Sequence, residues 1–459
     1  LLAMLDARVE SRPLDVAAAT DESALHGALV VLRLVLKDLD AAGAARRPPW
    51  RAALRRWLPP LLVRCARVSQ LALGIISDPS PEGFEPGADA DGQRPDPAGF
   101  PGVRLPDGGG GSVADVGFAV GGDDGAETPT NTLGKGKLLV VLCWLAIKEA
   151  SLLVGQAVQV GLPLPRAAFE GRGGGKAKAA RAAAGDGPDS DALLNCDEVD
   201  AAGRSLVRTL LATRHNGAIE KASTGLALVC ERLLASDAAE LAALPAAWLD
   251  ELLSTASRGA TTFLRRSAGL PFAVLAVLYA EHNLSKGGGA MIGVALRRLL
   301  ARAADEKGEE GGEAEGESEW GGRVHALNLL RHIYQDKAFG VAVMSHVADG
   351  FLCAFSALAS ARWAVRNSGT LLLASLLERA LRNRRSRDEH AEVNALGIRD
   401  FFARAPGLHA FLLRRLRTFD GGAADGADGD AATGALDQDV FALLLLLSKL
   451  VPSPTAQQA

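Results

Sequence analysis

The chain contains 459 residues, of which 48% are hydrophobic and only 5% aromatic, and its formal net charge is −4. This length is several times what one compact core requires, so the chain is either multi-domain or an elongated array of repeated units. Ala and Leu dominate over aromatic residues, which favours an all-α protein over one built from sheets.

Apolar residues recur at spacings of three and four along most of the chain, as expected for amphipathic helices. One stripe runs from Ile219 through Leu226 to Leu233. No segment shows convincing strand alternation. We predict helices at residues 21–40, 52–77 (broken at Pro59-Pro60), 136–160, 198–214, 217–235, 245–258, 267–282, 289–304, 322–335, 338–358, 361–383, 399–417 and 438–450.

Each stripe is too narrow to form a globule alone, and short turns join successive helices. This pattern predicts a superhelical α-solenoid of stacked helical pairs, of the HEAT or armadillo kind. Segments rich in Gly, Asp, Ala and Pro cannot bury enough apolar surface to offset their ordering, and are predicted to be disordered. The predicted order is helical repeats at 1–80, a disordered insertion at 81–135, a helix at 136–160, a disordered insertion at 161–196, helical repeats at 197–304, an acidic linker at 305–319, helical repeats at 320–418, an acidic linker at 419–436, and a C-terminal helix and tail at 437–459.

The negative charge is concentrated in these insertions. The stretches 86–128, 305–319 and 420–439 carry −6, −7 and −6, which leaves +15 on the rest of the chain. Such a surplus is large enough to attract the phosphates of a nucleic acid. The net charge of the whole chain therefore conceals a basic framework.

The sequence begins at Leu1, so we expect a fragment of a longer protein. Its longest uncharged apolar runs, 138–147 and 441–447, are shorter than the roughly 20 residues that cross a bilayer, and predict buried core helices with no membrane insertion. The cysteines are far apart and form no CxxC pair, which predicts reduced thiols in a cytoplasmic protein. They are Cys65, Cys143, Cys196, Cys230 and Cys353.

No motif predicts an active site. The glycine runs at 108–111 and 287–289 lack the strand, loop and helix order of a cofactor-binding fold. Cys230 and His215 have no orienting acid at a recognisable spacing, so we interpret them as a buried thiol and a surface imidazole. No histidine group has the companions that a zinc site needs. The sequence predicts a binding protein that is not an enzyme, with no catalytic residue, metal or cofactor of its own.

Three basic blocks fall at predicted helix ends. Residues 213–221 span a turn in which Asn216 is placed to cap the second helix. Residues 265–271 join two helices, with Ser267 available as a cap and Pro271 in the first turn. Residues 363–368 open a long helix.

Arginines at such turns can hold phosphates, because the planar guanidinium suits that task. The alternative is structural: arginines at turns also hydrogen-bond the carbonyls of a neighbouring helix end, and Trp363 would fill a core. The predicted RNA- or partner-binding residues are Arg214, His215, Arg265, Arg266, Ser267, Gly269, Pro271, Arg366 and Asn367.

Together these blocks resemble the THADA family, the thyroid adenoma-associated or death-receptor-interacting proteins, over residues 136–450. The order of motifs matches throughout, and departures cluster in the acidic insertions. The motifs are Cys143-Trp144, Lys148-Glu149, Thr213-Arg214-His215, Arg265 to Pro271, His325-Ala326-Leu327-Asn328, Trp363 to Ser368, Asp388-Glu389-His390 and Phe401-Phe402.

The resemblance implies a division of labour. Family members partner a separate S-adenosylmethionine-dependent enzyme that methylates the ribose 2′-hydroxyl of the first anticodon-loop nucleotide of tRNA. This chain would be the non-catalytic subunit that holds tRNA and enzyme in register, with S-adenosylmethionine bound by the partner and no DNA involved. It implies phosphate contact for the arginines and turn geometry for Gly269 and Pro271. The alternative is a protein-interaction scaffold for a death receptor or a membrane calcium pump, without RNA.

Overall fold

The computed structural model describes residues 25–76, 130–162, 192–258, 269–285, 289–306, 317–381, 396–421 and 441–451. Almost all of these residues are helical, as predicted. The chain forms two compact units, residues 1–248 and 249–459, and the division falls within one helix. Each unit is described by itself.

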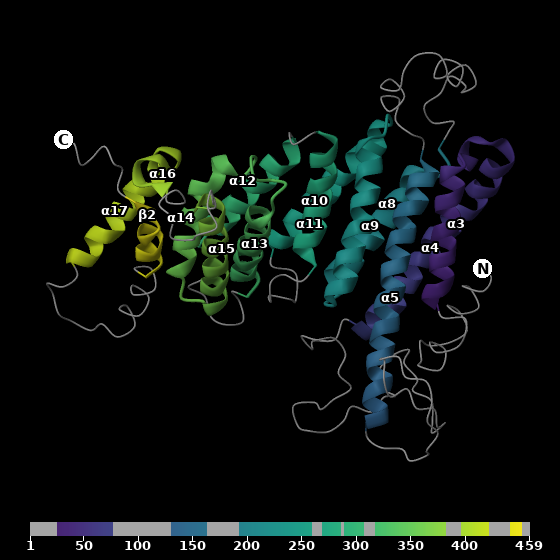
Figure 1. The fold of residues 1–459 in the computed structure, drawn as a ribbon, viewed down its shortest axis with the longest axis horizontal. Coiled ribbons are helices and arrows are strands. Elements are labelled where there is room, and N and C mark those ends of the chain that lie inside the picture. Colours follow the sequence, from purple (N-terminus) through teal and green to yellow (C-terminus); the bar gives the residue numbers. More distant parts are fainter. Residues whose placement is uncertain are drawn as a thin grey trace. The chain divides into compact units, whose positions relative to one another are not determined.

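The first unit is centred on one long helix, α5, which packs against α3, α4 and α9 (Figure 1). Helix α8 packs on α4 and α9. Near the middle of α5 the core joins Ile76, Cys143, Ile147 and Ala218, from three different helices. The elements are α3 (Leu25–Ala41), η1 (Ala44–Arg46), α4 (Pro48–Ile76), α5 (Thr130–Gly161), α8 (Cys196–Ala212), α9 (Asn216–Leu234) and the first part of α10 (Ala239–Ser257).

Helices α5 and α9 approach each other backbone to backbone. A Cβ on Gly225 of α9 would overlap the carbonyl oxygen of Ser151 on α5 and lie 2.9 Å from its carbonyl carbon. A Cβ on Gly155 of α5 would lie 3.3 Å from the carbonyl oxygen of Gly225. Because glycine has no side chain, these two positions allow the close crossing that places α9 on α5.

The ends of segment 163–191 are joined. The backbone N–H of Leu193 donates to the carbonyl of Gly161 over 2.7 Å. Helix α8 then begins with a capping box, in which Asn195 accepts from the N–H of Glu198 and the Glu198 carboxylate accepts from the N–H of Asn195. Both helix ends that flank the segment are therefore fixed by local hydrogen bonds.

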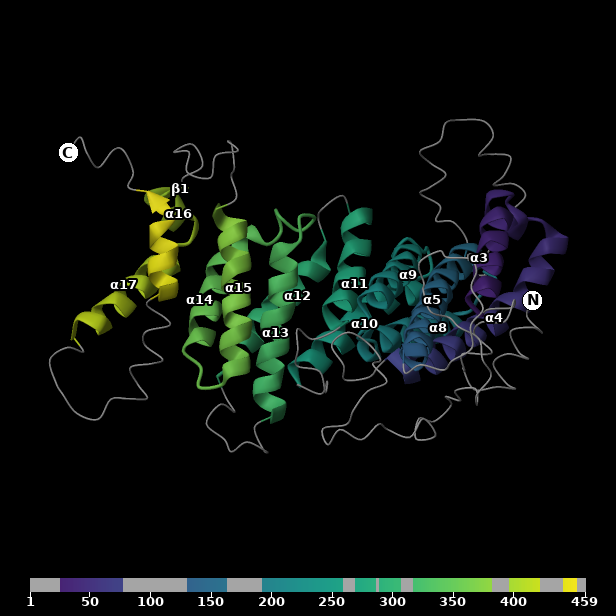
Figure 2. The same cartoon turned by 60° about the horizontal axis from the view of Figure 1, so that its bottom comes forward.

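In the second unit α13 and α14 both pack on α15, and α12 packs on α13 and α14 (Figure 2). Helix α11 packs on α12 and α13. The elements are the rest of α10, α11 (Leu270–Leu284), α12 (Ala290–Ala304), α13 (Glu317–Gln335), η4 (Met344–His346), α14 (Val347–Leu358), α15 (Trp363–Leu381), β1 (Leu396–Gly397), α16 (Ile398–Arg404), α17 (Pro406–Gly421), a helix at 441–448 and β2 (Leu450–Val451).

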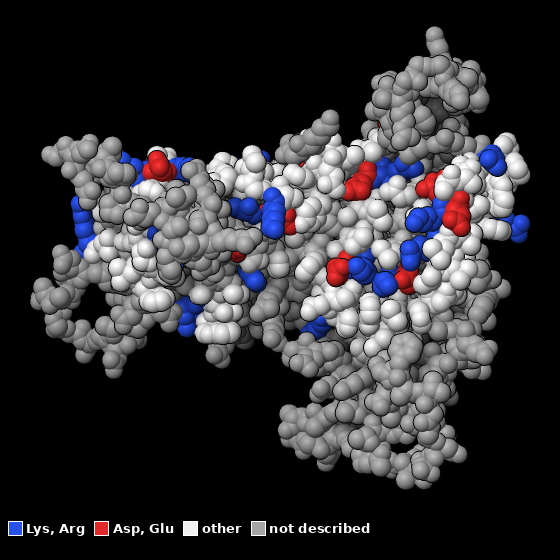
Figure 3. All heavy atoms as spheres, in the orientation of Figure 1, with Lys and Arg blue, Asp and Glu red and all other residues white. Residues whose placement is uncertain are grey.

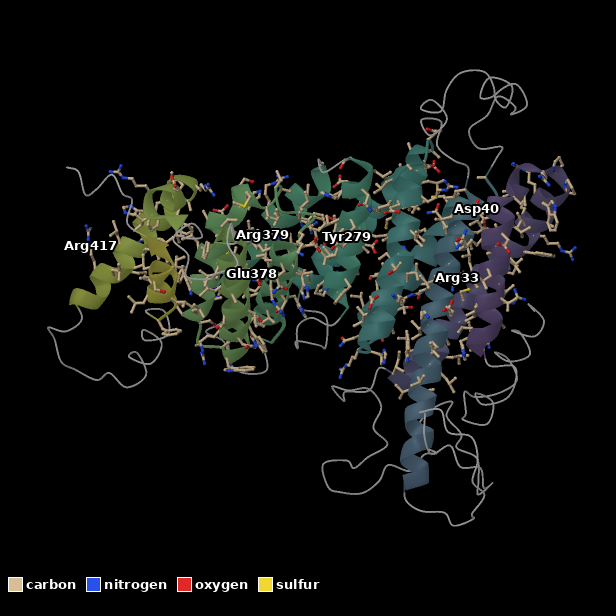
Figure 4. The ribbon with its side chains drawn as sticks, in the orientation of Figure 1. Arg33, Asp40, Tyr279, Glu378, Arg379 and Arg417 are labelled. Carbon is tan, nitrogen blue, oxygen red and sulfur yellow. The ribbon has the colours of Figure 1, made fainter. Side chains whose placement is uncertain are left out.

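Arginines in the second unit bind carbonyl groups at helix ends. Arg323 is almost fully buried, and its Nε donates to the carbonyl of Ala303, the last residue but one of α12, over 2.8 Å. Arg379 donates from Nε to the carbonyl of Tyr334 over 2.7 Å; Figure 4 labels Arg379. Charge-assisted hydrogen bonds of this kind satisfy carbonyls that have no partner within their own helix.

Several predictions about elements were wrong. Helix α10 begins at Ala239, six residues before the predicted start at 245. Helix α4 is unbroken at Pro59-Pro60, because its buried face packs along α5 and offsets the lost backbone hydrogen bonds. The predicted helix 338–358 begins only at Val347, after η4. The predicted helix 399–417 is two helices, since α16 ends before Ala405 and Pro406 starts a new one. Strands β1 and β2, which no alternation predicted, form a two-residue parallel pair.

The predicted insertions lie mostly outside the described residues. Their edges are corrected where helices extend into them: α5 begins at Thr130, α13 begins at Glu317 and α17 ends at Gly421. Leu193 and Leu194, placed in the 161–196 insertion, are buried against the first unit. Apolar residues within a polar stretch can thus belong to the neighbouring core.

Two helices in the described part of the chain are long and apolar enough to cross a membrane by length and composition alone, namely α4 and the Val140–Gly161 part of α5. The prediction based on uncharged runs missed them, because scattered charges and prolines interrupt their apolar residues. Both pack against other helices of the first unit. Buried core helices pass the same test.

Candidate functional site

Two motifs of the family resemblance meet in the first unit. Trp144 of α5 stacks on His215, which lies in the turn between α8 and α9, with ring centroids 5.4 Å apart and planes 15° from parallel. Both side chains are half-buried. We call Trp144, His215, Lys148, Glu149 and Arg33 the Trp144 cluster.

The turn that presents His215 is held by its own residues. Thr213 is the C-cap of α8, and its Oγ1 accepts from the backbone N–H of His215 over 3.3 Å. His215 is the N-cap of α9, where its Nδ1 accepts from the N–H of Ala218 over 3.3 Å. The predicted cap, Asn216, is wrong by one residue: it lies within the first helical turn and is exposed. The imidazole takes the role usually given to Asn or Ser.

Charged side chains border the ring pair. Lys148 is one helical turn after Trp144, and its Nζ lies 5.9 Å from the Trp144 ring centroid, within the range of a cation–π interaction. The same Nζ lies 3.2 Å from the carboxylate of Glu149. Glu149 is only 3% exposed, and its carboxylate accepts a hydrogen bond from Arg33 Nε over 2.8 Å. Figure 4 shows Arg33 on α3 beside α5. Glu149 is thus a buried anion held between two cations.

Burial lowers the pKa of His215 from its usual value of 6.5. The pKa of His26 on α3 is also lowered, first by burial, with Glu149 opposing the shift and Lys148 adding to it. A neutral His215 suits the site, because Nδ1 can accept from Ala218 only while it carries no proton. The Trp144 cluster therefore favours an uncharged imidazole.

We expect acid to destabilise the first unit through His215. Below about pH 6.5 the unfolded chain binds a proton that the folded site rejects, so stability is lost as the pH falls through and below that value. His215→Asn, which keeps a capping oxygen, should show a smaller fall in melting temperature than the wild type between about pH 7.5 and about pH 5.5. Equal falls in the two proteins would contradict the assignment.

The arrangement is suited to binding. An aromatic pair bordered by cations offers a surface for stacking and for anionic groups. Cys143, the residue before Trp144, is buried, and burial raises the pKa of its thiol to about 12, so the thiol stays protonated and is a poor nucleophile. In the described part of the chain no group of three or more His, Cys, Asp and Glu side chains is placed to hold a metal ion.

The structure places the second predicted block only in part. Arg265, Arg266 and Ser267 lie outside the described residues. Gly269 is the N-cap of α11, so the prediction of Ser267 as its cap is wrong by two positions. Gly269 has φ −83° and ψ −5°, a conformation open to any residue, and Pro271 lies buried in the first turn.

The third predicted block is largely structural. Arg366 Nη1 donates to the carbonyls of Ser360 and Ala361, both over 2.8 Å, which is the structural role weighed for turn arginines. Asn367 is exposed. The structural alternative in which Trp363 fills a core is wrong, because this residue is 70% exposed. The start of α15 therefore presents Trp363 and Asn367 to solvent while Arg366 braces the preceding turn.

The prediction from sequence placed Arg214 and His215 on one turn, where the structure has them, but left out the residues that His215 contacts. Trp144, Lys148 and Glu149 were noted only as part of the resemblance, although the four-residue spacing of Trp144 and Lys148 signals a shared helix face. Arg33 has no sequence signal, because its partner Glu149 is 116 residues away. Of the remaining motifs, 325–328 is buried in α13 and 388–390 lies outside the described residues.

Basic side chains are exposed on several elements of both units (Figure 3). They include Arg47, Arg56 and Arg67 at and along α4, and Arg414 and Arg417 on α17.

Comparison with known proteins gives a consistent result. A family model described as THADA/TRM732, DUF2428 matches residues 58–364, and one described as Trm732, C-terminal TPR repeats matches residues 366–459. No solved structure matches the chain.

Curated relatives carry related names. A human protein named tRNA (32-2'-O)-methyltransferase regulator THADA is 32% identical over 69% of this chain and 15% of its own length. A Drosophila melanogaster protein of the same name is 30% identical over 96% of this chain and 23% of its own. A Schizosaccharomyces pombe protein named tRNA (32-2'-O)-methyltransferase regulator trm732 is 24% identical over 47% of this chain and 14% of its own. The chain thus spans less than a quarter of these relatives.

Proposed function

The chain belongs to the THADA/TRM732 family, and from that membership we propose that it acts as the non-catalytic subunit of a tRNA ribose 2′-O-methyltransferase. The observation that carries the proposal is that relatives from human to yeast are named as regulators of this methyltransferase. The partner enzyme would bind S-adenosylmethionine and methylate the first nucleotide of the anticodon loop. This chain would hold tRNA and enzyme in a reactive orientation, which replaces an unfavourable bimolecular encounter.

The proposed architecture is an α-solenoid. Neighbouring helices pack as pairs within each unit, as in α4–α5 and α8–α9, or α12–α13 and α14–α15. The match of residues 366–459 to a model of TPR repeats supports repeated helical pairs, of the TPR kind there and of the HEAT or armadillo kind elsewhere. Such an array offers a long surface on which two large partners can bind at once.

Charge and local chemistry support tRNA as one partner. The framework outside the acidic stretches carries +15, and the Trp144 cluster combines aromatic rings with cations. We place the protein in the cytoplasm; the five free cysteines, four of them buried, support a reducing compartment.

The experiment that tests this function uses the full-length protein in its own cells. We expect purification to bring down tRNA and a methyltransferase, and removal of the protein to abolish ribose methylation at the first anticodon-loop nucleotide while methylation elsewhere on tRNA continues. Unchanged methylation after removal would overturn the proposal.

Salt dependence of the purified complex separates RNA from protein partners. Affinity for tRNA should fall steeply as salt rises, because each phosphate contact releases counterions. An apolar protein interface would be insensitive to salt, and binding of that kind alone would favour a scaffold without RNA.

A further inference from the structure

Helix α4 and the turn before it form an unusually basic stretch. Residues 41–76 contain seven arginines and no aspartate or glutamate. Most surface helices mix both signs of charge, and an acid-free run of this length repels cations and attracts polyanions. The stretch is part of the described first unit, and its apolar face packs along α5.

Two tryptophans are exposed on this basic helix. Trp50 is 43% exposed and Trp57 is 48% exposed, whereas Leu54 and Leu58 between and beside them are buried. Seven residues separate the tryptophans, so they lie on one side of the helix about 10.5 Å apart along its axis. Large aromatic rings left at the surface in this way are typical of binding surfaces.

Exposed arginines lie on the neighbouring side of the same helix, about a quarter to a third of a turn round from the tryptophans. Arg56 and Arg67 are eleven residues apart, about three helical turns, and share the side of α4 that faces away from the buried residues, with exposed Val63 between them. Arg55 is also exposed, but its Nη1 donates to the carbonyl of Ala192 over 3.0 Å.

We propose that the α4 surface, formed by Trp50, Arg56, Trp57, Val63 and Arg67, binds a single-stranded stretch of RNA. Unpaired bases stack on the tryptophan rings, and the neighbouring phosphates contact Arg56 and Arg67. Duplex RNA keeps its bases stacked on one another, so the exposed rings match a loop and not a stem. The inference rests on the proposed function, and it names a tRNA-contacting surface distinct from the Trp144 cluster.

The absence of acidic residues from the stretch 41–76 also argues against a protein partner. Protein interfaces use Trp and Arg too, but their basic residues meet acidic groups on the partner and their centres are depleted of charge. The basic stretch 41–76, with Arg56 and Arg67 exposed on α4, matches the negative charge of a phosphate backbone better.

The test measures binding of the full-length protein to a fluorescently labelled anticodon stem-loop RNA by anisotropy. Trp50→Ala and Trp57→Ala should each weaken binding about tenfold, and Trp→Phe at the same positions should restore most of the affinity, because a phenyl ring still stacks. Arg56→Glu with Arg67→Glu should reduce the slope of log affinity against log salt by about 0.7 for each lost contact. Circular dichroism checks that the variants remain folded.

Matched controls lie in the second unit. Phe441→Ala removes an aromatic residue that is 69% exposed, and Arg414→Glu with Arg417→Glu makes the same change in net charge; neither should reduce affinity for the stem-loop comparably. Wild-type affinity in the alanine variants overturns the α4 surface even where the protein is still required for methylation. If the Phe variants lose as much affinity as the Ala variants, the α4 surface is also overturned. The same holds if the Ala variants still bind RNA but no longer capture the methyltransferase.

The outcome is independent of the test of the proposed function. Loss of stem-loop binding in the α4 variants, with ribose methylation unaffected by removal of the whole protein, would support the RNA surface and refute the methylation role. Failure of the wild-type protein to bind the stem-loop at all would refute the α4 surface, whatever methylation shows.

Discussion

Gly225→Leu is expected to destabilise the first unit strongly. The backbone of α9 passes so close to α5 that even a Cβ at residue 225 would overlap the carbonyl oxygen of Ser151. Because this oxygen belongs to the backbone of α5, it cannot move aside as the end of a flexible side chain could. Overpacking a well-packed core costs about 1–3 kcal/mol for small additions. We expect Gly225→Ala to fall in that range and Gly225→Leu to exceed it, which is a large share of a typical domain's stability of about 5–15 kcal/mol.

Gly74→Ala is the matched control. Gly74 lies within α4, and nothing comes within 4 Å of the Cβ that alanine would add there. Alanine is a better helix former than glycine, so this change should stabilise the protein by up to about 1 kcal/mol. Chemical denaturation followed by circular dichroism gives both free energies of unfolding. A Gly225→Leu variant as stable as the wild type would show that α5 and α9 do not cross as described.

Replacing Arg265 and Arg266 together with alanine is expected to abolish ribose methylation while helicity is retained. The two residues lie between α10 and α11, outside the described residues, so the expectation rests on the paired guanidinium groups of the sequence and on their place in the family resemblance. If the two arginines contact phosphates and so orient tRNA relative to the methyltransferase, their loss removes that orientation. The rate advantage that comes from holding the reactants in place is then lost as well.

The contrasting variant is Arg366→Ala. The Arg366 guanidinium donates hydrogen bonds to the carbonyls of Ser360 and Ala361. Removing it should lower the melting temperature of the second unit by as much as the loss of one or two charge-assisted hydrogen bonds. Methylation assays with purified methyltransferase and tRNA, paired with thermal unfolding, separate the two effects. If the methyltransferase methylates tRNA fully in the presence of the Arg265 and Arg266 double variant, the two arginines do not make the proposed phosphate contacts.

Helical periodicity predicted most of the fold, because an amphipathic stripe is a local property of the sequence. It placed α9 at 217–235 against an observed Asn216–Leu234, and α12 at 289–304 against Ala290–Ala304. It failed where tertiary packing overrides a local rule. Pro59-Pro60 should break a helix, yet α4, packed along α5, continues through both prolines. The short pairing of β1 with β2 joins residues 54 positions apart and leaves no periodic trace.

The candidate site was harder to predict than the fold. The turn carrying Arg214 and His215 could be found from its composition and its resemblance to the family. The partners of that turn could not, because Trp144 is about seventy residues earlier and meets His215 only when α9 packs on α5. Whether an arginine binds a ligand or a helix end also depends on contacts that only the folded chain provides, as Arg366 shows.

The hydrogen bond between Leu193 and Gly161 keeps the two ends of segment 163–191 side by side, whatever sequence connects them. Closing a flexible loop becomes harder only slowly with length, by about 0.6 kcal/mol for each doubling. A longer connection between Gly161 and Leu193 is therefore expected to cost the folded unit little free energy. The same position can accept an affinity tag or a fluorescent protein, which gives experimenters a handle on the protein away from its termini.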